Sequence, residues 1–235
     1  IICGNASTAN YNTGGGGVCN KGTFILNSGT ITENSGSWGG GVENSYGSFT
    51  MNGGTISNNT ATIYKGGGIY SNEGFTITGG TVTGNHCKEY LGGGGVGLAI
   101  GASVSISGNP VIKNNTSGSS TNAASDVNLP SNSESPIMPM TIIGVMTEGA
   151  NIGVSSTETA PYVFAKGTDI YTVTEEDAAK FFNEKGYIAA KTESNELEFR
   201  VPVVADTPIT SVTVTGMDKP SAGADPDTDV TLVTV

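Results

Sequence analysis

Short segments in which apolar and polar residues alternate recur through the first 116 residues. Val or Ile follows a glycine run four times, at spacings of 24, 27 and 27 residues: Val18, Val42, Ile69 and Val96. A second alternating segment begins six to eight residues later, at Phe24, Phe49, Phe75 and Val104. A third begins six residues after the second, at Thr30, Thr55, Thr81 and Pro110. Alternation with a period of two over segments this short is typical of β-strands.

These repeats are too short to contain a crossover helix, so we expect each repeat to form one turn of a coil. Stacked turns give three parallel sheets around a narrow apolar interior, an all-β parallel β-helix. The inward positions then form four ladders: Val18/Val42/Ile69/Val96, Phe24/Phe49/Phe75/Val104, Leu26/Met51/Ile77/Ile106 and Ile31/Ile56/Val82/Val111. A column of side-chain amides is expected at one corner, formed by Asn34, Asn59, Asn85 and Asn114.

Glycine supports this prediction. The chain has 36 Gly among 235 residues, and 28 of them lie in residues 1–116. Glycine in a helix interior costs about 1 kcal/mol relative to alanine, which excludes a helical bundle there. The runs Gly14–Gly17 and Gly92–Gly95 could suggest phosphate-binding loops, but such loops precede a helix, and here strands follow. The glycine runs therefore mark one corner of each turn.

The Gly-Gly-Gly-Val/Ile and Phe-x-x-Asn pairs carry a family resemblance. Gly15–Val18 with Phe24–Asn27, and Gly39–Val42 with Phe49–Asn52, resemble the repeats of chlamydial polymorphic outer membrane proteins. They are still more similar to repeats in large surface proteins of Gram-positive gut bacteria. The resemblance covers residues 1–116 and implies a right-handed parallel β-helix, an extracellular position on a bacterial cell surface and a role in adhesion.

The second half of the chain is less regular. Strands are predicted at 126–130, 140–145, 150–154, 162–164, 187–189 and 197–199. A helix is predicted near 174–184, because Thr174 and Asp177 have capping-box spacing and Gly186 can end it. We therefore expect coils over 1–125 and irregular final coils with this cap over 126–201. Residues 202–235 are expected to be a linker and an incomplete immunoglobulin-like segment.

Charge separates the two halves. Residues 1–116 hold four acidic and four basic residues, so the formal net charge of −11 belongs to the second half. This balance argues against a nucleic-acid partner, which requires a basic surface. No window holds the roughly 18 consecutive apolar residues that a membrane span needs. No signal peptide is recognisable either, and we expect the sequence to be a fragment that opens inside a repeat.

Enzymatic chemistry has little support in the residues. Parallel β-helices include pectate lyases and polygalacturonases, whose chemistry needs clustered carboxylates or Ca²⁺ ligands. The repeats contain no Asp and no Arg, and their four Glu lie in unrelated positions. We therefore predict no catalytic, cofactor or metal residues. The alternative is a pectate lyase-like polysaccharide-processing fragment, either lyase or hydrolase, or a carbohydrate-binding module.

Three smaller features are interpreted structurally. The only histidine, His86, lies next to Cys87 in a predicted variable loop, and no further residues complete a four-ligand zinc site. The three cysteines, an odd number, imply no disulfide framework. Outward Thr pairs at three turns suit exposed strand positions and are too few for an ice-binding surface.

The predicted ligand surface consists of aromatic residues in the variable loops. Tyr11, Trp38, Tyr64 and Tyr90 each lie a few residues before a glycine run, so stacked turns would align them in a row. Aromatic side chains with polar rims suit contact with sugars or proteins. The alternative is that they cover the glycine corner. The expectation is a non-catalytic adhesin-like or spacer module, with host or extracellular glycans or proteins as partners.

Overall fold

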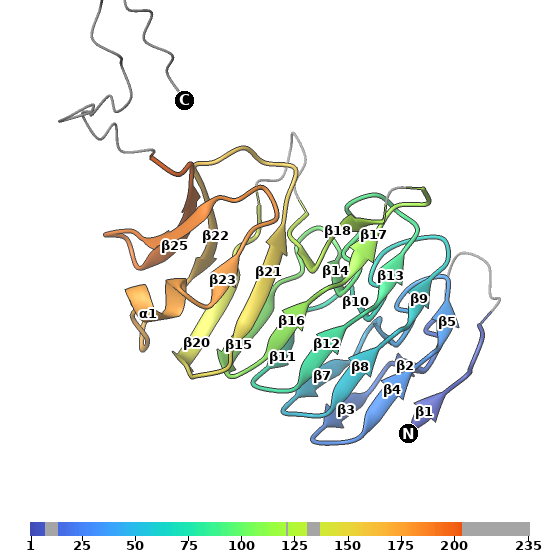
Figure 1. Cartoon of the computed structure of the whole chain (residues 1–235). Helices are drawn as coiled ribbons and strands as arrows, with labels where there is room; N and C mark the ends of the chain where they lie inside the picture. Colours follow the sequence, from blue (N-terminus) through green and yellow to red (C-terminus); the bar gives the residue numbers. More distant parts are fainter. Residues whose placement is uncertain (8–13, 121, 131–136, 204–235) are drawn as a thin grey trace, which may run out of the picture. The chain divides into compact units, whose positions relative to one another are not determined.

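The computed structural model describes residues 1–7, 14–120, 122–130 and 137–203. Contacts separate a first unit, Ile1–Pro202, from Val203–Val235. The first unit is a parallel β-solenoid of about six turns, with the turns stacked from β1 to β25 (Figure 1). The expected fold class, an all-β parallel β-helix with one short helix in its C-terminal cap, is confirmed. The predicted immunoglobulin-like segment lies, from residue 204 on, outside the described residues.

Each regular turn contains four short strands rather than the three predicted. The first face consists of β2 (Val18–Asn20), β6 (Val42–Asn44), β10 (Ile69–Ser71), β14 (Val96–Leu98) and β19 (Val127–Asn128). The second consists of β3 (Thr23–Leu26), β7 (Ser48–Met51), β11 (Phe75–Ile77), β15 (Val104–Gly108), β20 (Met140–Met146) and β22 (Tyr162–Lys166). The third consists of β1 (Ile2–Cys3), β4 (Thr30–Thr32), β8 (Thr55–Ser57), β12 (Thr81–Thr83), β16 (Val111–Lys113) and β21 (Asn151–Ser155).

The fourth face is the one that the sequence pattern missed. Its strands are β5 (Ser35–Gly36), β9 (Thr60–Ala61), β13 (His86–Cys87), β17 (Thr116–Ser117) and β18 (Ala123–Ala124). Two-residue strands show no alternation that could separate them from a loop. His86 and Cys87 therefore lie in a strand and not in the predicted solvated loop. Their inward positions carry small buried side chains, such as Ala61 and Cys87.

Three of the four predicted ladders are confirmed by the strand register. Val18, Val42, Ile69 and Val96 align one above another, and so do the ladders that begin at Phe24 and Leu26. The rings of Phe24, Phe49 and Phe75 stack at centroid distances of 5.3 and 5.5 Å. The fourth ladder was wrong in its last member, because Val82 aligns with Ile112 and not with Val111. Ile112 is buried, whereas its neighbours Val111 and Lys113 occupy the outward positions of β16.

The asparagine ladder is also shifted by one residue in that turn. Its members are Asn5, Asn34, Asn59, Asn85 and Asn115, and not the predicted Asn114. In each turn, the backbone N–H and side-chain N–H of one asparagine donate to the Oδ1 of the next, at 3.0–3.1 Å. Asn114 occupies the preceding corner position, where φ is +61°, and is exposed. Gly84 has the same role one repeat earlier, with a φ of +65°, and Asn58 two repeats earlier, with a φ of +54°.

The glycine runs and the asparagine ladder share one corner. A Cβ at Gly41 or Gly68 would lie 3.0 or 2.9 Å from the ladder amide of Asn59 or Asn85. A Cβ at Gly67 would overlap the carbonyl oxygens of Gly94 and His86. The glycines are therefore required because successive backbones approach closely at this corner.

The final turn and its cap break the repeat. β21 pairs with β16 through Ile152 and with β19 through Val154, so the third and first faces join without a strand of the fourth. Two further strands, β24 (Ile188–Lys191) and β25 (Glu196–Arg200), extend the second face in antiparallel orientation: β25 pairs with β22, and β24 pairs with β25. The predicted strands of this region are all present.

The cap helix is shorter than predicted. α1 spans Glu175–Ala178, with Thr174 as N-cap in a complete capping box with Asp177. The Phe181–Phe182 segment, which the prediction included in the helix, is strand β23 on β21. Pairing with a strand edge outweighs the local helical preference there. No helix among the described residues has the length and apolar character to cross a membrane.

Candidate functional site

The outer side of the first face is covered by the connections that arrive from the fourth face. We call these connections, residues 37–41, 62–67 and 88–94, the loop layer. As a result, β6, β10 and β14 are buried on both sides, unlike the other strands of the regular turns. Glu43 on this side is buried, and its Oε2 accepts hydrogen bonds from the backbone N–H groups of Gly14 and Gly15, in the connection that precedes β2, both at 2.7 Å. The loop layer is therefore packed on the coil.

Two of the predicted ligand residues lie together in this layer. The Trp38 and Tyr64 rings stack at 4.0 Å, and Trp38 also packs on the buried Tyr70 at 4.4 Å. Burial, with a smaller contribution from the Glu43 carboxylate, raises the pKa of Tyr70 to about 12. Trp38 and Tyr64 are half-buried, so they both cover the first face and present one edge to solvent.

The other two predicted residues are placed differently. Tyr90 is 65% exposed and makes no ring contact with another described aromatic residue. Tyr11 lies outside the described residues. The structure thus brings Trp38 and Tyr64 together, with Tyr90 in the next loop of the layer.

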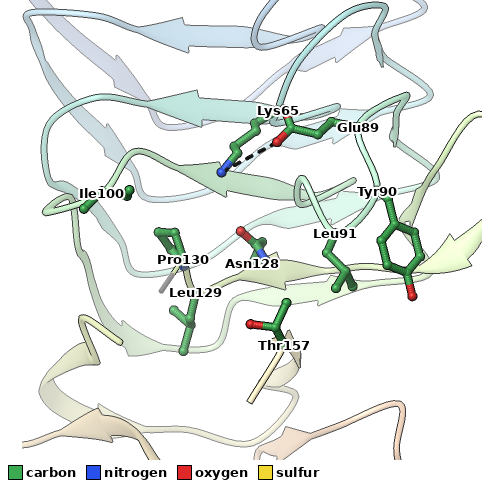
Figure 2. Close-up of a pocket in the computed structure, with 9 residues that line it drawn as sticks. All are labelled: Lys65, Glu89, Tyr90, Leu91, Ile100, Asn128, Leu129, Pro130 and Thr157. Atoms are coloured by element: carbon green, nitrogen blue, oxygen red, sulfur yellow. Dashed lines mark ion pairs between the residues drawn. The ribbon is translucent and has the colours of Figure 1, made fainter. Parts of the chain in front are cut away.

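Tyr90 belongs to a groove of about 240 Å³ on this side of the coil (Figure 2). The groove is lined by Lys65, Glu89, Tyr90, Leu91, Ile100, Asn128, Leu129, Pro130 and Thr157. Lys65 Nζ lies 3.9 Å from Glu89 Oε1 at its rim, and the two side chains are 24% and 38% exposed. A second depression, of about 190 Å³, shares Tyr90 and Leu91 and continues toward Ser155 and Glu184 of the cap.

The residues of the groove come from three different turns. Sequence analysis singled out only Tyr90, because Lys65, Glu89, Ile100 and Asn128 occupy unrelated positions of their repeats. Their proximity depends on the path of the loops over the first face. A signal for this site was therefore absent from the periodic pattern.

Two carboxyl groups lie close together where the regular turns end. Asp126 is buried, and its Oδ1 accepts hydrogen bonds from the backbone and side chain of Asn115 at 2.9 and 2.8 Å. Burial raises the pKa of Asp126, and it also raises the pKa of Glu184, with a smaller contribution from Asp126. Glu184 accepts a hydrogen bond from Ser155 Oγ at 2.8 Å.

The histidine and the cysteines are not assembled into a site within the described residues. His86 Nδ1 lies 2.9 Å from Thr116 Oγ1, and burial lowers its pKa. All three cysteines are free, and burial raises the pKa of Cys87 to about 12. In the described ranges, no three His, Cys, Asp or Glu residues are grouped as metal ligands would be.

Comparisons with known proteins add no family to this description. No family model matches the chain, and no curated protein or solved structure shows significant similarity to it.

Proposed function

We propose that this chain is a non-catalytic binding or spacer module displayed on a bacterial cell surface, with the loop-layer side of the coil as its contact surface. The observation that carries the proposal is the loop layer itself. It is a set of connections held in register on a rigid stack of turns, with Trp38, Tyr64 and Tyr90 in successive loops. Loops positioned by a rigid scaffold commonly carry binding residues.

The composition of this side supports glycans or proteins as partners. Aromatic rings next to polar groups supply apolar contact and hydrogen bonds together, which both kinds of ligand need. The regular turns are close to electrically neutral, with four acidic and four basic residues in the first 116. A neutral surface favours recognition by shape, stacking and hydrogen bonding over long-range attraction of a charged polymer.

Binding of the full chain to host mucin and to a glycan array tests this proposal. The variant has Tyr11, Trp38, Tyr64 and Tyr90 all replaced by Ala, and we expect at least a tenfold loss of apparent affinity. Tyr46→Ala is the matched control, because Tyr46 is 76% exposed but lies in the connection from β6 to β7. Circular dichroism of both variants verifies that the coil is intact. Equal binding by the quadruple variant and the original chain would contradict the proposed surface.

A further inference from the structure

Asn128 is a buried polar residue that no interaction within the described structure explains. It is only 5% exposed, yet its side-chain amide makes no hydrogen bond to another described residue. Amide groups of buried residues nearly always have a partner in the protein or in ordered water, so an amide that is open only to a groove is available to a ligand there. Asn128 thus contrasts with Asn44, which is also buried and bonds to Asn20 and Ser71.

The free amide faces the groove. Figure 2 shows Asn128 at its centre, between the Lys65–Glu89 pair and Thr157. At the same position one turn earlier the chain has Gly97, so no side chain from the preceding turn covers the amide in that row. The groove therefore presents a donor and an acceptor on a buried, pre-positioned group.

The rim adds polar groups of both kinds without net charge. The Lys65–Glu89 separation of 3.9 Å exceeds the 2.7–3.2 Å of a protein hydrogen bond, so both heads retain capacity for a ligand. Lysine supplies donors and glutamate supplies acceptors, and their charges cancel. A ligand with neutral groups that both donate and accept, such as hydroxyls, fits this rim.

Apolar surface completes the lining. Tyr90 and Leu91 stand on one side of Figure 2 and Ile100 on the other, with Leu129 and Pro130 between. The volume of about 240 Å³ is below the roughly 300–1,000 Å³ of sites for drug-sized molecules. A single ring with hydroxyl groups and an apolar C–H face matches both the size and the chemistry.

We infer that this groove is the binding site for one neutral sugar residue of a glycan. The Asn128 amide and the Lys65–Glu89 pair bond its hydroxyls, and the Tyr90 ring contacts its apolar face. The remainder of the glycan extends into solvent along the loop layer. This inference rests on the proposed function for its ligand class, and it adds the subsite and the exclusion of acidic sugars.

Titration of the full chain with single methyl glycosides tests the inference. The neutral probes are the methyl glycosides of glucose, galactose, mannose and N-acetylglucosamine, and the acidic probes are those of glucuronate and galacturonate. Binding is followed by NMR chemical-shift changes. We expect saturable binding of at least one neutral probe, with shifts at Asn128 and Tyr90, and at least tenfold weaker binding of the uronates.

Two variants separate binding from stability. Asn128→Leu removes the amide at similar size, so we expect at least tenfold weaker binding with an unchanged or higher melting temperature. Tyr90→Ala should also weaken binding about tenfold, whereas Tyr46→Ala should leave it unchanged. Lower stability of Asn128→Leu with unchanged affinity would overturn the inference, as would uronates binding better than neutral probes.

The outcome for the groove is distinguishable from the outcome for the proposed function. If mucin binding persists fully in Asn128→Leu, the groove proposal fails and the wider surface stands. If the original chain binds no mucin or array glycan, the proposed function fails. The monosaccharide titration still decides the groove in that case, because absence of saturable binding by every neutral probe overturns it.

Discussion

The regular turns and the last turn have different residues at the glycine corner and different hydrogen-bond partners for the asparagine ladder. In the regular turns, glycines allow adjacent backbones to approach, and each asparagine of the ladder bonds to the next. In the last turn, Ser125 and Asp126 stand in the register of Gly94 and Gly95, one turn later. Asp126 accepts the two hydrogen bonds of Asn115 that the next asparagine would otherwise accept.

This difference shows how the asparagine ladder can end. An asparagine in the final position would carry a side-chain N–H donor with no next ladder member to accept it, whereas an aspartate is an acceptor only. The carboxylate is nevertheless buried, which raises its pKa. Termination thus replaces an unpaired donor by a buried ionisable group at the junction with the cap.

The largest expected effect comes from the glycine corner. Gly67→Ser places a Cβ against the carbonyl oxygens of Gly94 and His86, so we expect a loss of more than about 4 kcal/mol or failure to fold. Ser125→Gly makes the opposite change in the last turn. It should stay within about 1 kcal/mol, because the buried Ser125 hydroxyl has no partner in the described structure. Urea unfolding measures both, and equal losses would show that the two turns do not differ at this position.

The asparagine ladder gives the next largest effect. Asn85→Leu leaves the donors of Asn59 and the carbonyl of Ile56 without partners in the interior, so we expect a loss of about 3–4 kcal/mol. Asn52→Leu is the matched control. Asn52 makes a hydrogen bond of 2.8 Å to Asn27 at an exposed corner, and its loss should cost less than about 1 kcal/mol. The two unfolding free energies are compared in urea, and a similar loss at both positions would contradict the role of burial.

The ionisable end of the ladder predicts a smaller, pH-dependent effect. A raised carboxyl pKa means that the folded chain binds more protons than the unfolded chain between the two pKa values. Stability therefore falls as pH rises from about 4, the usual aspartate value, through the folded pKa of Asp126. In Asp126→Asn this part of the pH dependence should disappear. The free energy of unfolding of both chains is measured from pH 4 to 8. An unchanged slope against pH in Asp126→Asn would refute the assignment of this pH dependence to Asp126.

The smallest expected effect lies in the cap. Thr174→Ala removes the side chain that accepts from the Asp177 backbone, at a cost of about 1 kcal/mol. Since α1 packs mainly on β20 and β24, faster amide hydrogen exchange should be confined to the cap. Thr174→Ser retains the hydroxyl and serves as the control. Faster exchange throughout β7 and β8 would instead show that the cap and the regular turns unfold together.

Most of the coil was predictable from the sequence, and the groove was not. Stacking repeats the same contacts once per turn, so the spacing of the repeats alone predicts the ladders that begin at Val18, Phe24 and Leu26. The Pro110 repeat misled the prediction because an extra residue shifts Ile112 and Asn115 by one position. The fourth face was not predicted because its strands have only two residues, too few to show alternation.

By itself, the sequence determined the parallel β-helix, its glycine corner and its asparagine ladder, since periodic contacts require periodic residues. Only the tertiary structure decided where the ladder ends, which loop covers which face and that Lys65, Glu89, Tyr90 and Asn128 line one groove. Those contacts join residues from different turns at unrelated positions. The geometry of these contacts depends on the path of individual loops, which the repeat pattern of the sequence does not specify.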